Sequence, residues 1–253
     1  MKFRLTTSVL AAATTLAPLC SQALEAEANP REGFGLGLAL MSEQKPYRNV
    51  DNKLEVWPML TYENRWLRVA GPGVDFKLGK SGSLSYALTA SFSREGYKAS
   101  DSSYLDGMDE RKDGVWLGGR VTWIHEIANL SAAWRGDASS HSKGQKLTLG
   151  AEHRFSVDKL GITPRVAAIW QDRKYVDYYY GVKASEVRAD RAAYAGSSTV
   201  NGEVAVRVDY RLSSAQSVFV DAGVTLLGAG ITDSPLVSRS TVGALRLGYL
   251  YRF

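Results

Sequence analysis

Apolar and polar side chains alternate along most of the chain after residue 24. A period of two puts every second side chain on the same face of an extended strand, so the alternation predicts β-strands. No apolar run in this part reaches the ~18 residues that a membrane-spanning helix needs. The apolar faces of the predicted strands are formed by Phe34, Leu36, Leu38 and Leu40; Leu54, Val56, Pro58, Leu60 and Tyr62; Val74, Phe76 and Leu78; Leu84, Tyr86, Leu88, Ala90 and Phe92; Val115, Leu117, Val121 and Trp123; Leu147, Leu149, Ala151 and Phe155; Val204, Val206, Val208 and Tyr210; and Leu245, Leu247, Tyr249, Tyr251 and Phe253.

The length of these strands favours a membrane barrel over a soluble sandwich. Segments of roughly 10–13 residues are long enough for a tilted strand to cross the ~25 Å apolar band of such a barrel. Aromatic residues stand near strand ends, where the girdles of a membrane barrel lie: Trp123, Phe155, Trp170, Tyr210, Tyr249 and Phe253. The pattern therefore predicts an all-β protein, a transmembrane antiparallel up-and-down β-barrel whose apolar face contacts lipid.

The connections between the predicted strands alternate between short and long. Short turns are expected near Glu63–Arg65, Lys80–Gly82, His125–Ala128, Ser156–Lys159 and Ser213–Ala215. Longer connections are expected at Ser42–Asp51, Gly96–Asp113, Ala138–Lys143, Arg173–Thr199 and Gly228–Arg239, with a tight turn at Gly71-Pro72-Gly73 on the same side. This predicts 12 strands with both termini on the short-turn, periplasmic side. Ten strands are the alternative if the two N-terminal hairpins are misread, and one unbroken strand over 65–79 would make the count odd.

Charged residues fall mainly on the predicted inward face. The acids there are Glu55, Glu63, Asp75, Glu152, Glu203, Asp209 and Asp221, and the bases are Lys77, Arg120, Lys146, Arg154, Arg165, Arg207, Arg211 and Arg246. Charges inside a protein persist when they are paired or hydrated. The near balance of signs predicts an ion-pair network that fills a narrow lumen. The alternative is a permeation path, although a selective pore typically carries a surplus of one sign.

The first 23 residues have the pattern of a cleaved secretory signal peptide. Lys2 and Arg4 precede an apolar run over 5–19, and small residues before and at Ala23 suit a signal peptidase. Cleavage after Ala23 would leave no cysteine, because Cys20 is removed, and 29 basic against 26 acidic residues, a formal charge of +3. The sequence therefore predicts a signal peptide over 1–23 and a barrel domain over 24–253.

Composition and motifs exclude several other classes of protein. The whole chain has 253 residues, a formal charge of +5, three His and one Cys. A lone cysteine cannot form an internal disulfide, and scattered histidines do not match a zinc site. The weak, dispersed positive charge argues against nucleic-acid binding. No cofactor or metal is expected.

One polar loop contains the residue types of a nucleophilic catalyst: Asp137, Ser139, Ser140, His141 and Ser142. It loosely resembles the His/Ser pair of outer-membrane phospholipases. In that family one residue separates His from Ser, so that both side chains point the same way. Here His141 and Ser142 are adjacent and would point to opposite faces. We therefore expect a structural polar loop and no catalytic residues.

The last predicted strand carries a signature of its own. Leu245, Leu247, Tyr249, Tyr251 and Phe253 alternate up to a terminal aromatic residue. This resembles the C-terminal signal that outer-membrane proteins present to their insertion machinery. An ordinary edge strand is the alternative, but a long apolar exposed edge is poorly tolerated in a soluble protein.

Two loop segments have a more specific composition. They are Tyr175–Val182, followed by Glu186, Arg191 and Tyr194, and Ile231–Val237. With Pro58, Tyr62, Leu105-Asp106-Gly107-Met108 and Arg111, these segments resemble the MipA/OmpV family, the MltA-interacting scaffold proteins of the Gram-negative outer membrane. The motif residues in the loops are Tyr178, Tyr179, Tyr180, Gly181, Val182, Glu186, Arg191, Tyr194, Asp233, Ser234 and Pro235. Both segments are expected on the outer side of the barrel, folding over or into its mouth.

The resemblance implies a non-enzymatic, monomeric barrel in outer-membrane lipid. Its expected partners are a periplasmic murein hydrolase and a penicillin-binding protein, which such a scaffold brings together at the cell envelope. A small porin-like channel or an adhesin is the alternative. The family has no agreed catalytic residues to carry over. Since the predicted periplasmic turns are short, a partner would contact the tail over 24–31 or the rim of the barrel.

Overall fold

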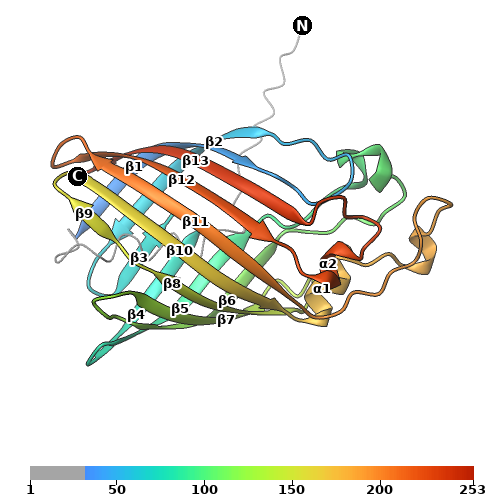
Figure 1. Ribbon diagram of the computed structural model, residues 1–253, viewed down its shortest axis with the longest axis horizontal. Helices are drawn as coiled ribbons and strands as arrows, with labels where there is room; N and C mark the ends of the chain where they lie inside the picture. Colours follow the sequence, from blue (N-terminus) through green and yellow to red (C-terminus); the bar gives the residue numbers. More distant parts are fainter. Residues whose placement is uncertain (1–31) are drawn as a thin grey trace, which may run out of the picture.

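The computed structural model describes residues 32–253, so the predicted signal peptide and the tail over 24–31 lie outside the described residues. The strands form one antiparallel barrel (Figure 1). They are β1 (Gly33–Glu43), β2 (Leu54–Glu63), β3 (Leu67–Ala70), β4 (Gly73–Ser81), β5 (Leu84–Ser93), β6 (Gly114–Trp123), β7 (Asn129–Asp137), β8 (Gln145–Glu152), β9 (Phe155–Val157), β10 (Leu160–Gln171), β11 (Thr199–Arg211), β12 (Gln216–Leu226) and β13 (Thr241–Arg252).

The barrel closes because β1 pairs with β13 over Gly35–Glu43 and β10 pairs with β11. β8 and β9 both pair with β10 and together make one interrupted strand. The interruption lies beside Pro164, whose carbonyl accepts from the His153 backbone N–H at 3.3 Å and which has no N–H to return. Counted in this way the barrel has 12 strands, as predicted, and the ten-strand alternative is wrong.

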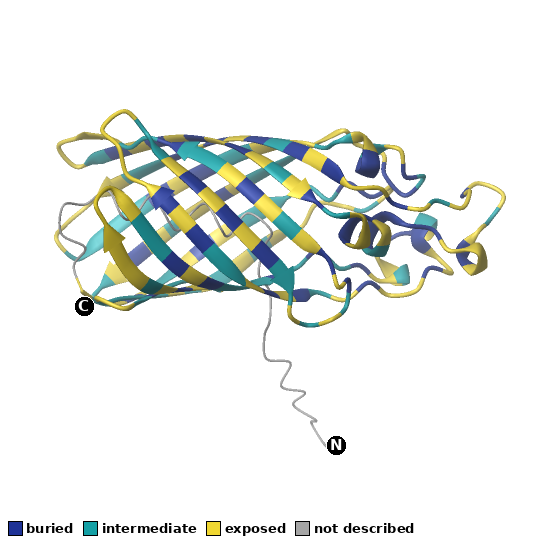
Figure 2. Cartoon of the chain, turned by 90° about the horizontal axis from the view of Figure 1, so that it is seen from below, coloured by how far each residue is buried: buried dark blue, intermediate teal, exposed yellow. Residues whose placement is uncertain are grey.

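Burial alternates along the strands, which gives the banded pattern of Figure 2. Outward positions carry exposed apolar side chains, such as Leu38, Leu88 and Leu247, and inward positions carry buried polar ones. The large apolar side chains would be costly to leave in water, whereas lipid accepts them. No helix among residues 32–253 has the length and apolar character needed to span a membrane.

The two ends of the barrel differ, as the loop pattern predicts. Short turns and the C-terminus lie at one end, and the long connections lie at the other (Figure 1). These connections carry the short helices η2 (Ala99–Asp101), η3 (Ser103–Leu105), α1 (Arg173–Tyr180), η4 (Ala184–Glu186) and α2 (Ala229–Thr232).

The β3–β4 hairpin departs from the predicted strand length of roughly 10–13 residues, because β3 has only 4 residues. β2 pairs with β3 only over Thr61–Glu63, and one further bond joins the Gly71 N–H to the Leu60 carbonyl at 3.0 Å. Within the described chain, the part of β2 over 54–60 has no partner strand on that side, and we call it the β2 free edge. Proline is tolerated there because its missing N–H leaves no unpaired donor, and Pro58 lies on this edge.

The C-terminal strand allows a direct test of assembly. The Phe253 N–H donates to the Phe34 carbonyl at 2.9 Å, and the Phe253 ring lies 5.0 Å from that of Tyr251. We expect deletion of Phe253 to lower the amount of heat-modifiable barrel in outer membranes, because the closing strand loses its aromatic end. Phe155→Ala is the control, since it removes an exposed aromatic side chain from the same end of the barrel. Wild-type amounts of folded barrel after the deletion would contradict this.

Candidate functional site: a loop plug above an ionic lumen

The first part of the site is helix α1, whose sequence fixes both its ends and its buried face. Asp172 begins the helix by accepting a hydrogen bond from the Tyr175 N–H at 2.9 Å. The helix ends at Gly181, whose N–H donates to the Asp177 carbonyl. A Cβ at position 181 would lie 2.2 Å from that carbonyl oxygen, so only glycine fits. Residues 175, 176, 179 and 180 form the buried face, which the i, i+4 spacing of a helix allows.

This face packs into an apolar cluster over the outer mouth of the barrel. We call this cluster the loop plug; its residues are Tyr47, Tyr97, Leu105, Met108, Trp116, Tyr175, Val176, Tyr179, Tyr180, Val182, Ile231, Leu236 and Val237. They come from four long connections, together with Trp116, which points inward from β6. The rings of Tyr47 and Tyr97 meet edge to face at 4.7 Å, and those of Tyr47 and Tyr180 stack at 5.6 Å. The plug therefore has a packed core of its own.

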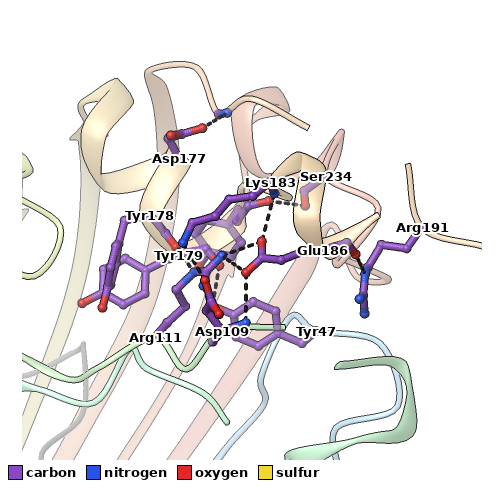
Figure 3. Close-up of polar contacts among 12 residues, drawn as sticks. Tyr47, Asp109, Arg111, Asp177, Tyr178, Tyr179, Lys183, Glu186, Arg191 and Ser234 are labelled. Atoms are coloured by element: carbon purple, nitrogen blue, oxygen red, sulfur yellow. Dashed lines mark hydrogen bonds and ion pairs between the residues drawn. The ribbon is translucent and has the colours of Figure 1, made fainter. Parts of the chain in front are cut away.

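A buried ion pair holds two of these connections together (Figure 3). One Nη of Arg111 donates to both carboxylate oxygens of Glu186 at 3.0 Å, and both side chains are almost fully buried. The same carboxylate accepts the backbone N–H groups of Asp109 and Lys183 at 2.9 Å. The Arg111 Nε donates to the Tyr178 carbonyl at 2.6 Å. The desolvated pair is thus surrounded by hydrogen bonds, which a buried pair requires.

Arg191 is the second buried cation of the plug, and backbone carbonyls satisfy it. Its Nε donates to the Glu186 carbonyl at 2.9 Å, and its Nη atoms donate to the carbonyls of Tyr104 and Asp106. The side chain has no exposed surface. Arg191 therefore fixes the backbone of the 94–113 connection against that of the 172–198 connection.

The second motif segment, Ile231–Val237, is also part of the plug and is hydrogen-bonded to the end of α1. The Ser234 hydroxyl donates to the Tyr180 carbonyl at 2.6 Å, and the Tyr47 hydroxyl donates to the Tyr179 carbonyl at 3.3 Å (Figure 3). The Pro235 carbonyl accepts from Arg48 Nε at 2.8 Å. The Tyr194 hydroxyl donates to the Gly230 carbonyl, which joins α2 to the same assembly.

The structure thus brings most of the loop-motif residues together. Tyr178–Val182, Glu186, Arg191, Tyr194, Ser234 and Pro235 all take part in the plug or its hydrogen bonds, as do Leu105, Asp106, Met108 and Arg111. Asp233 is exposed at the end of α2, and Pro58 and Tyr62 lie on β2, away from the plug. Tyr47, Tyr97 and Trp116 were missed. Aromatic residues in otherwise polar connections were the available signal.

Burial keeps the tyrosines of the plug neutral. Loss of solvent raises the pKa of Tyr47, Tyr175 and Tyr179 above the ordinary value for a phenol. At the exposed surface, by contrast, a hydrogen bond from Lys183 lowers the pKa of the Asp109 carboxyl. The plug therefore packs through neutral rings, and its buried charges are those of Arg111, Glu186 and Arg191.

Below the plug, charged side chains of the lumen form ion pairs between strands. Arg165 donates to both oxygens of Asp221 at 2.8 and 2.9 Å, and its Nε lies 3.6 Å from Glu203. Arg246 lies 3.7 Å from Asp221. Further pairs join Arg120 to Asp75, Arg154 to Asp209, Lys77 to Glu63, Lys146 to Glu95 and Arg94 to Glu55.

The remaining predicted lumen residues occupy different surroundings. Glu152 is buried opposite Arg165 in the β8–β10 pairing. The Arg207 guanidinium lies 3.9 Å from the centre of the Phe219 ring. Arg211 is exposed at the end of β11, at the rim. Three further charged residues, Arg68, Glu95 and Arg135, are also buried and were not predicted from the sequence.

The polar loop after β7 is built around Asp137. Its carboxylate accepts the N–H and hydroxyl groups of Ser139 and Ser142 and the N–H of Lys143. His141 Nδ1 lies 2.7 Å from the Asp113 carbonyl oxygen. The carboxylate therefore orders a turn, and in the described part of the chain the imidazole contacts backbone. Over residues 32–253 no cluster of three His, Cys, Asp or Glu side chains could hold a metal.

A closed antiparallel barrel with a lipid-compatible outer face, an ionic lumen and a cap of its own loops defines a plugged β-barrel of the bacterial outer membrane. Residues 36–253 match the family described as MltA-interacting protein MipA, and the chain belongs to this family. The resemblance seen in the loop motifs is thereby confirmed, as is the outer-membrane location.

Curated relatives cover nearly the same span. The MltA-interacting protein of Escherichia coli K12 is 27% identical over 225 residues, which is 87% of this chain and 90% of the relative. The putative outer membrane protein YiaT of the same strain is 25% identical over 224 residues, 87% of this chain and 91% of the relative. The outer membrane protein OmpV of Vibrio cholerae serotype O1 is 24% identical over 157 residues, 62% of this chain and 61% of the relative. None of these names is that of an enzyme.

Solved structures with a related outline are also barrels. The NanC porin covers 86% of this chain and all of its own, with a TM-score of 0.48 and 8% identity. The COG4313 outer membrane channel from Pseudomonas putida F1 covers 88% of this chain and 96% of its own, with a TM-score of 0.44 and 13% identity. No functional conclusion follows from likeness at this level.

Proposed function

We propose that this protein is a non-enzymatic scaffold that holds a murein hydrolase and a penicillin-binding protein at the inner face of the outer membrane. The observation that carries the proposal is the loop plug. A packed aromatic cluster with a buried Arg111–Glu186 pair covers the outer mouth, which suits a barrel that anchors other proteins better than one that conducts. The name of the Escherichia coli relative supports the choice of a murein enzyme as partner.

The short-turn end supplies the contact surface in this proposal. Three turn or rim residues there are apolar and strongly exposed: Trp66, Ile127 and Val157, the last two at 78% and 71%. Exposed apolar side chains around a rim are typical of protein contacts. They lie on or next to separate short turns, so a partner would rest across the rim of the barrel rather than on one long loop.

A binding experiment with matched variants tests this proposal. We expect the full-length barrel in detergent to retain a purified lytic transglycosylase and a penicillin-binding protein. Ile127→Ser together with Val157→Ser should weaken retention at least several-fold, because apolar contact area is lost. Val187→Ser, an exposed apolar residue on the opposite, outer end, is the control. Retention of neither enzyme by the wild-type barrel would refute the scaffold function.

A small channel is the second candidate. It is favoured by a cavity of about 740 Å³ at the mouth, between the 44–53 and 94–113 connections and lined by Lys53, Glu55 and Arg94 among others. Planar-bilayer recordings separate the two candidates. The scaffold proposal expects a correctly folded barrel to be silent, whereas discrete conductance steps from the wild-type protein would favour the channel.

A further inference from the structure

Arg135 is a buried cation of the lumen, just below the loop plug. It points inward from β7 and is 5% exposed. It lies opposite Gly118 on β6 and opposite Lys146 on β8. Gly118 lies in turn opposite Thr89 on β5, so the position between Thr89 and Arg135 has no side chain.

Arg135 differs from the lumen arginines around it because it has no carboxylate partner in the described part of the barrel. Arg120 pairs with Asp75 at 2.8 Å, and Lys146 pairs with Glu95. The Nε of Arg135 is buried without a hydrogen-bond acceptor. These three cations share two carboxylates, which leaves one positive charge uncompensated. An unpaired buried charge is costly, so the site favours an added anion.

The guanidinium lines a cavity that is rich in hydrogen-bond donors. The cavity has a volume of about 130 Å³, and its polar lining includes Ser93, Arg135, Lys146, Thr148, Gln171 and Asn201. The Ser93 hydroxyl is buried and has no hydrogen-bond partner there. Three carboxylates, Glu43, Glu95 and Glu203, also line it. Glu95 and Glu203 are each held by a base, Lys146 and Arg165 respectively, and Glu43 has an interaction of its own. The volume suits a small polyatomic anion.

We propose that the lumen below the loop plug binds a small oxyanion, a phosphate or carboxylate group, with Arg135 as its principal cation. The planar fork of a guanidinium binds two oxygens of such a group at once, which a halide cannot match. Ser93 on β5 and Thr148 on β8 supply neutral donors from the lining of the same cavity. The proposal stands independently of the scaffold function, since it concerns the lumen and not the rim.

Thermal unfolding tests the site in the intact barrel. The protein is kept in a maltoside detergent, so that phosphate reaches it only as added salt and not as a lipid headgroup. We expect sodium phosphate, and more weakly sodium acetate, to raise the Tm above that in sodium chloride of equal ionic strength, because a ligand stabilises the state that binds it. In Arg135→Gln this increment should vanish, while the Tm without phosphate should equal or exceed that of the wild type.

A second lumen arginine provides the matched control. Arg207→Gln removes a buried guanidinium that lies over Phe219, away from the cavity, and should keep the phosphate increment. Equilibrium dialysis with labelled phosphate adds a direct measurement, with one ion bound per wild-type barrel and displacement by sulfate. Arg135→Lys, which keeps the charge but loses the fork, should bind about tenfold more weakly. Equal increments in phosphate and chloride, or an unchanged increment in Arg135→Gln, would overturn the proposal.

Discussion

Replacing Glu186 with Ala is expected to release the loop plug while the barrel stays folded. The substitution leaves the Arg111 guanidinium buried without its carboxylate, and it leaves the N–H groups of Asp109 and Lys183 without acceptors. Removing one partner of a buried ion pair typically costs about 3–5 kcal/mol. The plug is built from connections and not from the strand ladder, so this cost falls on the loops.

Limited proteolysis reports on the loop plug, and the heat-induced gel shift reports on the folded barrel. Glu186→Ala should be cut rapidly within 94–113 and 172–198, yet keep the gel shift of a folded barrel. Asp190→Asn is the control, because it removes a carboxylate of the same connection whose pair with Arg188 is exposed. Protease resistance equal to that of the wild type would show that the Arg111–Glu186 pair does not hold the plug.

The second large effect is expected for Arg165→Met in the centre of the lumen. Arg165 donates twice to Asp221 and lies beside Glu203, and all three side chains are almost fully buried. Its loss leaves two buried carboxylates near each other, with Arg246 3.7 Å from Asp221. We expect the free energy of unfolding to fall by about 3–5 kcal/mol.

Urea unfolding of the barrel in lipid vesicles measures this change. Arg154→Met is the matched control, since Arg154 also makes two hydrogen bonds to a carboxylate, that of Asp209, but both side chains are partly exposed. Arg154→Met should lower the free energy of unfolding clearly less than Arg165→Met does. Adding Asp221→Asn to Arg165→Met should restore part of the lost stability, because one of the two buried carboxylate charges disappears. Equal effects of Arg165→Met and Arg154→Met would contradict the role assigned to burial.

The strands could be predicted from sequence because lipid and lumen impose opposite demands on successive residues. In runs such as Leu245–Phe253 the alternation is regular, and the turns are predicted where it breaks. The plug could not be predicted in the same way. Helix α1 has an Asp N-cap and a buried face, but Tyr175–Tyr180 reads equally well as an aromatic loop. Its partners, Tyr47 and Tyr97, come from connections more than 70 residues away in the chain.

The alternation of apolar and polar residues also could not predict which charged side chains pair in the lumen. Alternation indicates that Arg165 and Asp221 face inward, but only the stagger of β10, β11 and β12 decides which base meets which acid. The inward orientation of Arg135 and Arg68 was not predicted, because glycines and small residues around them weaken the period of two.

The β2 free edge makes one seam of the cylinder much weaker than the others. β2 and β3 share 3 residue pairs, whereas β10 and β11 share 12. Local opening begins where the fewest ladder bonds must break. The β3–β4 hairpin should therefore peel from β2 before any other pair of strands separates, and its amides should exchange with deuterium first among those of the wall. Opening of this seam would briefly expose the polar interior to the surrounding lipid at one fixed position on the circumference.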